Sequence, residues 1–525
     1  MSDREFYLVG GGIAGLAAAA LLIRDARMPG TSIHVFEQSD VLGGSLDGAG
    51  DADAGYVIRG GRMFEAHYGC TLDLFSSIPS LSCPQISVTE EILDFTDRVV
   101  TSSRSRLVSG RQRMEAPALN LSRQDRWDLA RLSLRSEQSI GPARIEDYFA
   151  PAFFKTNFWF MWCSMFAFQP WHSLIEFRRY MRRFIHLLPG FNRLEGILRS
   201  PYNQYDSLVV PLQRWLLGKG VNIHTGTSVR ALSFSEGEAP SAITSIELET
   251  AHGTSRIQVK ETDLVMVTLG SMTEDSTLGS MDTPAPLRTN PERGAWKLWR
   301  TIARRSAVFG NPDVFARKVN QSMWASFTVT LKDPTFFKFM ERFTGNPAGT
   351  GGLVTFKDSN WLMSVVLPRQ PHFLNQPEDV QVFWGYGLRP ALTGNRIDKP
   401  MSGCSGMEIL EELFYHLPIG DQKAKVAATA NCIPCMMPFI TSQFMPRSAG
   451  DRPPVIPLGA RNFAFLGQFC ELPADTVFTV EYSVRTAQTA VFGLLDLKKR
   501  ATPLYRGYRN PGVVLRALRA LRALA

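Results

Sequence analysis

The sequence predicts an α/β fold, because its first segment alternates strand, helix and strand with a glycine turn after the first strand. Residues 6–9 read as a buried strand, the stretch after the glycine turn as a helix through Ile23, and 32–36 as a second strand that ends on Glu37. The turn has G-x-G-x-x-G spacing, with Gly10, Gly12 and Gly15. Strand, glycine turn, helix, strand and terminal acid in this order are typical of a Rossmann-type domain that binds a dinucleotide.

Each part of this motif has a mechanical role. Gly10 makes the tight turn, Gly12 lets backbone approach a pyrophosphate, and Gly15 lets the helix pack closely on the strand. The helix N-terminus then faces the phosphates, and Glu37 is placed to accept hydrogen bonds from ribose hydroxyls. The apolar run 6–23 also suggests a membrane span or a signal peptide, but its glycines and the lack of a basic leader favour dinucleotide binding.

Composition describes an ordinary globular protein. A chain of 525 residues is long enough for about two to four domains. The net charge of +8 suits an anionic ligand or surface, but the absence of a Lys/Arg block or nucleic-acid motif argues against nucleic acid as a partner. Seven cysteines without a secretory signal indicate a reducing compartment, and Cys432 and Cys435 are expected to be buried thiols, not a redox pair. The eight histidines lack paired ligand spacing, so no metal is expected.

A second glycine turn follows Glu37 and indicates which dinucleotide is bound. Gly43, Gly44 and Ser45 would again bring backbone against a cofactor. This continuation resembles that of FAD-binding flavoproteins with two dinucleotide-binding domains, such as amine oxidases and phytoene desaturases, more than that of NAD dehydrogenases. FAD is therefore the expected cofactor. The next motif would form either a mobile loop beside the flavin or a plain β-turn, and consists of Arg59, Gly60, Gly61 and Arg62.

An aromatic stretch and a basic helix follow in the middle of the chain. Residues 153–168 are rich in aromatics and methionine, which fits core packing or the wall of a tunnel for a long apolar ligand. In a helix over 171–188, Tyr180 shares a side with Arg183 and with two phenylalanines, Phe177 and Phe184. From the residues alone this phenol either packs there or donates a proton between apolar walls and positive charge.

The second half of the chain returns to the dinucleotide domain. We expect a helix over 207–217, strands at 221–224 and 264–269, a hairpin over 244–259, and helices over 288–343. A strand over 462–466 then reaches Gly467, and a loop leads into a helix that runs to Leu497. Such a terminal strand, loop and helix would close an FAD domain against the flavin, through Gly467, Phe478, Thr479 and Val480.

The C-terminal tail, 513–524, places three arginines within one helical arc and most leucines opposite. This pattern suits an interfacial helix on an anionic membrane. A helix of this length also suits packing against the protein or fraying, so both interpretations stay open.

Several longer strings are more specific than the dinucleotide motif. They are RGGR at 59–62, NFW at 157–159, WHS at 171–173, RRY at 178–180, YNQYD at 202–206, RQPHF at 369–373 and MPFITSQFMPR at 437–447. These strings resemble those of the oleate hydratases, once called myosin-cross-reactive antigens, and the likeness spans nearly the whole chain.

The resemblance implies an FAD-containing hydro-lyase that adds water to the cis-9 double bond of free oleic acid, giving 10-hydroxystearic acid. The tyrosine of Arg-Arg-Tyr, here Tyr180, would protonate the alkene. Gln204 and His372 would help to hold the carboxylate, although His372 beside two prolines otherwise reads as a structural hydrogen-bonding residue. No electrons change hands, so FAD would act structurally or electrostatically, most effectively when reduced. The aromatic stretch becomes a candidate tunnel wall.

Together these features predict a discontinuous FAD-binding Rossmann-type domain of the two-dinucleotide-binding flavoprotein kind. An inserted mixed α+β domain would bind the fatty acid, and a helical tail would follow. The predicted ranges are 1–70, 206–290 and 431–500 for the FAD domain, 71–205 and 291–430 for the substrate domain, and 501–525 for the tail.

The sequence departs from the family pattern in two places. Met63 stands where the family usually has the glutamate proposed to activate water. Glu65 is then the weaker candidate for that role, beside flavin and backbone groups that would orient the water. Val366 and Pro368 stand where relatives commonly have Thr and Asn, so carboxylate binding would lean on the glutamine and histidine named above and on an arginine.

The sequence also leads to expectations about the oligomeric state and the cellular location, and it leaves two alternative functions open. Many relatives carry an N-terminal extension used in dimerisation, whereas this chain begins almost on its first strand, so a monomer or weak homodimer is expected. The expected location is cytoplasmic, with peripheral contact at the inner membrane face through the tail. The alternatives are a flavin redox enzyme of desaturase or amine oxidase type acting on an apolar substrate, and a non-catalytic, membrane-associated lipid or flavin binder.

Overall fold

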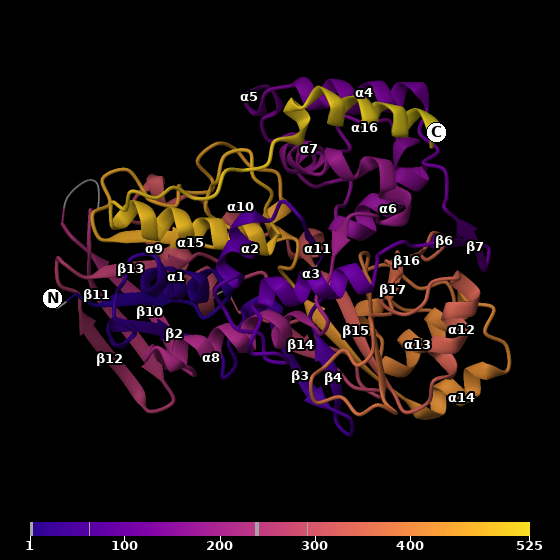
Figure 1. Cartoon of the computed structure of the whole chain (residues 1–525), viewed down its shortest axis with the longest axis horizontal. Coiled ribbons are helices and arrows are strands. Elements are labelled where there is room, and N and C mark those ends of the chain that lie inside the picture. Colours follow the sequence, from indigo (N-terminus) through magenta and orange to yellow (C-terminus); the bar gives the residue numbers. More distant parts are fainter. Residues whose placement is uncertain (1–3, 62, 237–240, 291, 525) are drawn as a thin grey trace.

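A five-stranded parallel sheet forms the centre of the dinucleotide-binding part (Figure 1). The computed structural model describes residues 4–61, 63–236, 241–290 and 292–524. All neighbouring strands of this sheet are parallel. Its strands come from both ends and from the middle of the chain. In spatial order they are β20 (Phe463–Leu466), β13 (Leu264–Thr268), β1 (Phe6–Val9), β2 (Ile33–Phe36) and β9 (Asn222–His224).

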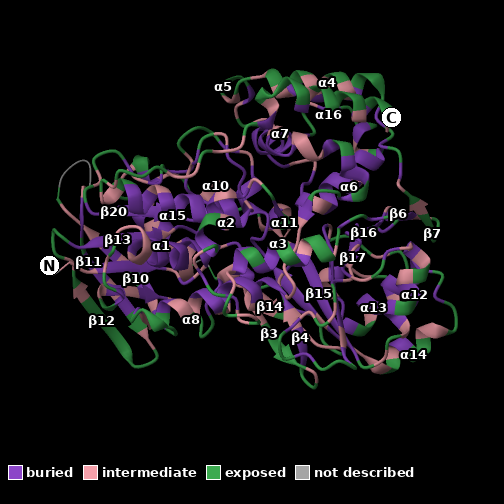
Figure 2. Cartoon of the chain, viewed as in Figure 1, coloured by how far each residue is buried: buried purple, intermediate pink, exposed green. Residues whose placement is uncertain are grey.

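Helices α1 (Ile13–Arg24) and α15 (Val480–Leu494) pack on each other beside this sheet. The middle of α1 is a run of four alanines, 17–20, all buried, and these small side chains allow the two helices and the sheet to approach closely (Figure 2). The predicted α/β class and the predicted first strand, helix and second strand are confirmed.

An antiparallel three-stranded sheet adjoins the parallel sheet, and two short ribbons lie elsewhere, one of them with β4 (Gly55–Ile58) against β15 (Trp324–Leu331) of a second sheet. The predicted hairpin over 244–259 is confirmed, because β11 (Ile243–Thr250) pairs with β12 (Gly253–Gln258), and β10 (Ser228–Phe234) adds the third strand. A turn of π-helix, Tyr205–Val209, leads into α8 (Val210–Gly218). The ribbons pair β3 (Gly48–Asp51) with β4 (Gly55–Ile58), and β5 (Phe64–Glu65) with β8 (Ile197–Leu198).

The second part of the molecule is built on a mixed eight-stranded sheet (Figure 1). Its order is β14 (Thr277–Leu278), β19 (Ala430–Met437), β15 (Trp324–Leu331), β18 (Gln381–Gly387), β17 (Met363–Val366), β16 (Val354–Phe356), β6 (Ser105–Ser109) and β7 (Gln112–Glu115). A second hydrophobic core joins its strands to three helices, α12 (Thr335–Thr344), α13 (Gly406–Tyr415) and α14 (Gln422–Thr429).

One expectation in this region was wrong. The stretch 288–343 was expected to be helical, but it contains β15, every residue of which is buried. The strand is rich in aromatic and β-branched residues, and pairing on both sides fixes it as a central strand. In the described part of this stretch the α-helices are α9 (Gly294–Ala303), α10 (Asp313–Ala316), α11 (Val319–Ser322) and all but the last residue of α12.

A helical lobe covers one end of the molecule, at the top of Figure 1. It contains α4 (Arg123–Leu134), α5 (Glu137–Ile140), α6 (Asn157–Phe166), α7 (Leu174–Arg183) and α16 (Pro511–Ala523), and two further helices, α2 (Gly69–Phe75) and α3 (Val88–Arg98), lie beneath it. The helix expected over 171–188 is shorter. It ends at Arg183, and 3-10 turns follow over Ile185–Arg193, because Pro189 lacks an N–H and its ring clashes with the carbonyl of Ile185.

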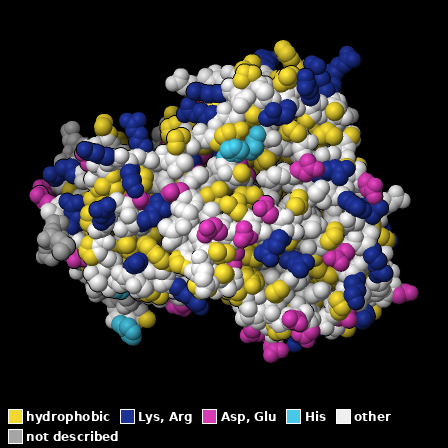
Figure 3. Space-filling model, in the orientation of Figure 1, with side chains coloured by type: hydrophobic (Ala, Val, Ile, Leu, Met, Phe, Trp, Pro, Cys, Tyr) yellow, Lys and Arg dark blue, Asp and Glu magenta, His cyan; other side chains and the backbone are white. Residues whose placement is uncertain are grey.

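The tail forms a helix that packs on the protein and also exposes apolar surface. α16 buries Val513, Ala517 and Leu521 against the 3-10 segment, as the packing interpretation predicts. Leu515 and Leu518 remain 49% and 44% exposed beside the arginines of the tail. Lys and Arg side chains gather over α4 and α16 in Figure 3. In the described part of the chain, no helix is both long and apolar enough to cross a membrane.

Candidate functional site

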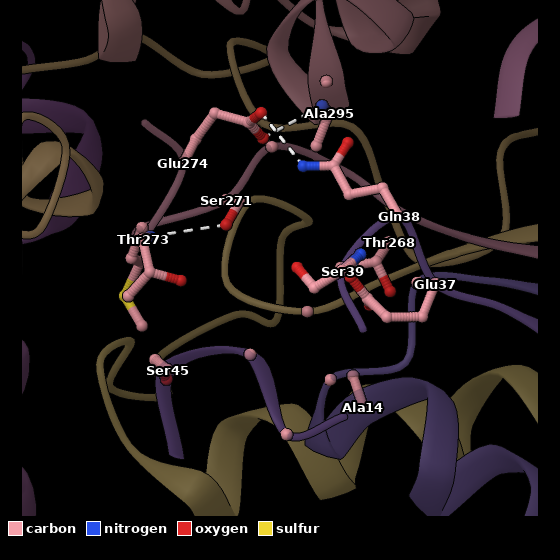
Figure 4. A pocket seen from close by; sticks show the side chains of 18 of the residues that line it. Ala14, Glu37, Gln38, Ser39, Ser45, Thr268, Ser271, Thr273, Glu274 and Ala295 are labelled. Atoms are coloured by element: carbon pink, nitrogen blue, oxygen red, sulfur yellow. Dashed lines mark hydrogen bonds between the residues drawn. The ribbon is translucent and has the colours of Figure 1, made fainter. Parts of the chain in front are cut away.

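A cleft of about 1430 Å³, counting space open to solvent, lies at the carboxyl ends of the parallel strands. In open α/β sheets this edge is where ligands bind. Figure 4 shows side chains that line it, from the first glycine turn, the end of β2 and the segment after β13. Of the predicted cofactor residues, those that line this cleft are Gly10, Gly12, Glu37, Gly43, Gly44, Ser45, Arg59 and Gly467.

The three glycines of the first turn differ in what surrounds them. Gly10 has a φ of +103°, a left-handed conformation that favours glycine. A Cβ on Gly12 would meet nothing within 4 Å, so its backbone faces open cleft. Gly15 lies outside the cleft lining, and a Cβ there would lie 2.1 Å from the carbonyl oxygen of Gly10. Gly15 therefore serves the close contact of helix and turn.

Polar groups around the cleft fit a dinucleotide such as FAD. The carboxylate of Glu37 accepts from the backbone N–H of Gly11 at 2.7 Å and of Ser39 at 2.9 Å, which fixes its orientation at the end of β2. The hydroxyl of Thr268 is buried in the cleft without a hydrogen-bond partner in the described structure. A buried hydroxyl of this kind needs a partner, and a bound ligand would supply one.

Sequence reasoning missed Thr268 and Glu274 at this cleft. Thr268 ends β13, and its signal was its place at the carboxyl edge of a parallel strand. Glu274 accepts from Gln38 Nε2 at 3.2 Å and from the backbone N–H of Ala295 at 3.1 Å (Figure 4). Burial raises the pKa of this carboxyl. Nothing in its local sequence distinguished it.

The Arg-Gly-Gly-Arg loop runs from the dinucleotide cleft to two smaller cavities. Arg59 donates its Nε to both carboxylate oxygens of Asp47, at 2.7 and 2.8 Å. Gly60 follows it in the loop, and Gly61 lines both smaller cavities. Arg62 lies outside the described residues.

The first of these cavities, here called the tyrosine cavity, has a volume of about 600 Å³ including space open to solvent. Tyr180 lines it together with Met63 and Glu65. The other predicted cofactor residues, Phe478, Thr479 and Val480, also line it, so it adjoins the loop before α15. Of the aromatic stretch, Met165 and Phe166 line it, whereas five of its other residues are buried core: Phe153, Phe158, Trp159, Met161 and Trp162.

The side chain of Tyr180 is 1% exposed and is held among aromatic rings. Its hydroxyl donates to the carbonyl oxygen of Val477 at 2.5 Å. Four rings contact it, from α6, the segment after α6, the residue after α7 and the segment after β19: Phe166, Phe168, Phe184 and Phe444. Arg183 points instead to the carboxylate of Glu65.

Glu65 is the centre of a buried polar network. Its Oε1 lies 2.6 Å from Nη2 of Arg183, and its Oε2 lies 2.8 Å from Nδ1 of His67 and 3.3 Å from Nε2 of His186. Burial alone would raise the pKa of Glu65, but the His186 hydrogen bond and the Arg183 charge outweigh it and hold that pKa at about 2. One carboxylate oxygen of Glu65 and one ring nitrogen each of His67 and His186 lie within 4.8 Å of one another, as the ligands of a metal ion would. The sequence did not predict this cluster, because His186 is far from the other two residues along the chain. The guanidinium of Arg183 already supplies a positive charge beside the carboxylate of Glu65, where a metal ion would otherwise lie. We therefore interpret the cluster as an ion-pair network.

The second cavity, here called the arginine cavity, has a volume of about 520 Å³ including space open to solvent. Gln204 and His372, the predicted carboxylate partners, both line it, as do Val366 and Pro368. Arg199, which sequence reasoning did not single out, lines it as well.

Arg199 brings a positive charge into this cavity. It donates to the carbonyl of Gly351 at 2.8 Å and to the hydroxyl of Thr101 at 3.1 Å, and it has no acidic partner in the described part of the chain. Burial lowers the pKa of Arg199 to about 10, so it stays charged at neutral pH. Burial, followed by the charge of Arg199, lowers the pKa of His372 to about 3. The imidazole is therefore neutral beside a permanent cation.

The cysteines form no disulfide, since all seven are free and all lie within the described residues. Cys432 and Cys435 lie on β19 and belong to the two separate hydrophobic cores. Burial raises the pKa of Cys435 to about 11. The prediction of buried thiols is confirmed.

Comparison with known proteins gives a family and two curated relatives. A family model described as the MCRA family matches residues 3–492. An oleate hydratase from Streptococcus pyogenes serotype M49 (strain NZ131) is 41% identical over 508 residues, which are 94% of this chain and 86% of that protein. A linoleate hydratase from Lactiplantibacillus plantarum is 31% identical over 568 residues, covering 99% of each.

Solved structures share the fold at low sequence identity. Cyclohexylamine oxidase from Brevibacterium oxydans IH-35A has a TM-score of 0.52 and 13% identity, over 94% of this chain and 99% of that chain. An oxidoreductase from Methanosarcina mazei has a TM-score of 0.50 and 13% identity, over 94% and 100%. At this identity the likeness concerns the fold alone.

Proposed function

The chain belongs to the MCRA family, and from that premise we propose that it is an FAD-containing fatty acid hydratase. It adds water to the cis-9 double bond of oleic acid, and of similar free unsaturated fatty acids, to give 10-hydroxystearic acid. The names of its curated relatives, oleate hydratase and linoleate hydratase, support this reaction. The structural observation that carries the proposal is the buried hydroxyl of Tyr180 in a cavity beside the cofactor loop.

The two smaller cavities supply a path for a long substrate. They share Gly61, so a chain that enters the arginine cavity would reach the tyrosine cavity past the glycine loop. Arg199 would pair with the substrate carboxylate, and Gln204 and neutral His372 would hydrogen-bond to it. Charge-assisted hydrogen bonds of this kind are the strong ones, and a fixed carboxylate sets how far the double bond extends into the second cavity.

The chemistry requires this positioning. An isolated alkene offers no polar handle, so a proton must reach one carbon while water attacks the other. Enzymes lower such barriers by about 8 to 23 kcal/mol, whereas a single general acid contributes only about 10²- to 10⁴-fold. Fixing the alkene against Tyr180 in a cavity walled by aromatic rings supplies much of the rest, because it orients the reactants and excludes stray water.

Tyr180 would donate its hydroxyl proton to the alkene. In the free protein that proton is shared with the carbonyl of Val477, which keeps the hydroxyl in one orientation inside the cavity. Proton donation to substrate would require the hydroxyl to rotate away from this carbonyl.

Water would be oriented and not deprotonated by Glu65. A carboxylate with a pKa of about 2 is a weak base, but it is a permanent acceptor that lines the same cavity as Tyr180. Met63 lines that cavity too and cannot act as a base. We therefore assign Glu65 a positioning role, with the attacking water also held by backbone groups. The proton that this water loses when its oxygen bonds to carbon would pass to the Tyr180 phenolate, which restores the acid for the next turnover.

The cofactor cleft fits FAD, held by the two glycine turns, Glu37 and the helix N-terminus of α1. Bound FAD would supply an electrostatic and structural contribution beside the reaction, most effectively in its reduced form. Phe478 and Thr479 of the loop before α15, and Val480 at the start of that helix, would connect the cofactor to the tyrosine cavity.

Assembly and location are part of the same proposal. We propose a monomer or weak homodimer in the cytoplasm. Peripheral contact with the inner membrane face would use α16, which exposes Leu515 and Leu518 beside Arg516, Arg519 and Arg522. Exposed leucines between basic residues suit shallow insertion into an anionic surface.

The competing function is a flavin redox enzyme of desaturase or amine oxidase type, because solved oxidases share the fold. Anaerobic mixing of the oxidised FAD-loaded protein with oleate separates the two. The hydratase proposal predicts hydroxystearic acid with no loss of the oxidised flavin absorbance. Bleaching of the flavin in proportion to oleate consumed, with no hydroxy product, would favour the redox function.

A further inference from the structure

A small cleft on the opposite face of α7 from Tyr180 is lined by arginines. Helical geometry places Arg178 and Arg182 on the side of α7 away from Tyr180, and Arg179 and Arg183 on its flanks. These arginines line a cleft of about 250 Å³, including space open to solvent, that is closed from the other side by Ala474, Leu504, Tyr505 and Tyr508. The cleft therefore lies between the catalytic helix and the segment that leads into the tail.

The positive charge of this cleft is only partly neutralised. Arg179 donates to Glu137, Glu471 and two backbone carbonyls, so its hydrogen-bonding capacity is used within the protein. Among the described residues, Arg178 has one acidic partner, Glu137, at 3.5 Å. Arg182 stacks over the ring of Tyr508 at 3.6 Å and has no acidic partner among the described residues.

Several guanidinium nitrogens of the arginines that line the cleft also lack acceptors. The Nε of Arg178 and the Nε and Nη1 of Arg183 are buried and have no hydrogen-bond partner in the described structure. Buried donors of charged groups are costly to leave unpaired. Burial and the charge of Arg182 lower the pKa of Arg178, and the charge of Glu137 offsets this only in part.

We propose that this cleft binds a phosphate group through Arg178, Arg182 and Arg183. Guanidinium groups pair with phosphate oxygens through two parallel hydrogen bonds, and the oxygens of a tetrahedral phosphate can meet arginines that reach it from successive turns of one helix. A planar carboxylate has two oxygens and satisfies fewer of these donors. The phosphate is either free or the headgroup of a lipid, and α16 begins only a few residues after Tyr508.

This inference is independent of the hydration reaction. The cleft is distinct from the cofactor cleft and from both substrate cavities, and its lining shares only Arg183 with the Glu65 network. Binding can therefore be measured on the FAD-loaded protein without turnover.

The test compares inorganic phosphate with chloride at equal ionic strength, using calorimetric titration of the full-length protein. Arg182→Gln removes a partly exposed side chain without breaking an ion pair described in the structure, so this variant should fold normally. Arg304→Gln, at an exposed arginine on another surface, is the matched control. We expect saturable phosphate binding that weakens about tenfold or more in Arg182→Gln and is unchanged in Arg304→Gln.

A second arm identifies the source of the phosphate. Co-sedimentation is measured with vesicles of phosphatidylcholine containing phosphatidylglycerol. If a lipid headgroup is the ligand, inorganic phosphate competes with these vesicles and Arg182→Gln sediments less than Arg304→Gln. If free phosphate is the ligand, sedimentation is the same for both variants while titration still depends on Arg182. Phosphate binding no different from chloride, with sedimentation indifferent to phosphate and to Arg182→Gln, would overturn the proposal, as would equal losses in both variants.

Discussion

The hydroxyl of Tyr180 donates a 2.5 Å hydrogen bond to the backbone carbonyl of Val477. This contact joins helix α7 to the loop that precedes α15. The next three residues, Phe478 and Thr479 of that loop and Val480 at the start of α15, line the same cavity as the phenol. The proposed acid and the cofactor loop are therefore fixed to each other before substrate binds.

Substitutions at two glycines of the first turn should have different effects, one on FAD binding and the other on the stability of the apoprotein. Gly12→Ala adds a methyl into open cleft, so the apoprotein should unfold as the unchanged protein does while FAD binds more weakly. Gly15→Ala forces a methyl against the carbonyl of Gly10 at 2.1 Å, so the apoprotein itself should be destabilised. Gly218→Ala, where a Cβ meets nothing within 4 Å, is the control. Thermal unfolding with and without FAD measures both effects, and equal behaviour of the first two variants would contradict the assignment.

Arg199 should determine recognition of the free acid. Arg199→Gln removes the only charge that we assign to the substrate carboxylate, and its loss should raise KM for oleate roughly tenfold or more with a smaller change in kcat. The same variant should lose the preference of the unchanged protein for oleate over methyl oleate. Arg104→Gln, at an exposed arginine outside the cavity, is the control. An equal loss of activity toward acid and ester would mean that Arg199 serves the fold and not the carboxylate.

Buried His172 should make stability depend on pH. Burial lowers the pKa of His172 to about 3, against about 6.5 in an unfolded chain. Between those values the unfolded state binds a proton that the native state does not. The free energy of unfolding should therefore fall as pH drops below about 6.5, by up to about 1.4 kcal/mol per pH unit from this residue.

Denaturant unfolding between pH 6.5 and 4.5 measures this slope. His172→Gln should flatten it by about one proton, whereas His252→Gln, at an exposed histidine, should leave it unchanged. The His172 assignment fails if the slopes of the unchanged protein and His172→Gln coincide.

The pair of Glu65 and Arg183 should be strongly coupled. Glu65→Gln leaves a buried guanidinium without its counter-charge, which typically costs about 3 to 5 kcal/mol of stability. The double variant Glu65→Gln/Arg183→Gln should recover part of that loss in chemical denaturation. Hydration by the FAD-loaded, folded fraction of Glu65→Gln should also slow. A hydration rate equal to that of the unchanged protein would remove Glu65 from the reaction while leaving its structural role intact.

Local patterns in the sequence were sufficient to predict the main strands and helices of the dinucleotide-binding part. The G-x-G-x-x-G turn, its helix and the flanking strands depend on contacts close in sequence, and the hairpin of β11 and β12 does too. The same patterns misjudged β15, because a buried strand between helices has no alternation to reveal it. They also overextended α7, where Pro189 ends the helix before its own position.

Long-range assembly explains what sequence could not predict about the site. Arg199 and His372 meet only because the segment after β8 lies against the segment between β17 and β18, and neither local sequence shows it. The Glu65 network likewise joins β5 to α7 and the turn that follows it. Tyr180 was accessible to sequence reasoning only through the family strings, since helical spacing alone could not say whether its face met a cavity.

The most direct test of the account is hydration of oleate in isotopically labelled water. The FAD-loaded protein is incubated with oleate in water enriched in deuterium and oxygen-18, and the product is analysed by mass spectrometry. The account predicts hydroxystearic acid with one carbon-bound deuterium and one oxygen-18 hydroxyl, and a loss of at least about 10²-fold in its rate of formation by Tyr180→Phe that still binds FAD. Labelled product formed by Tyr180→Phe at the rate of the unchanged protein would contradict it.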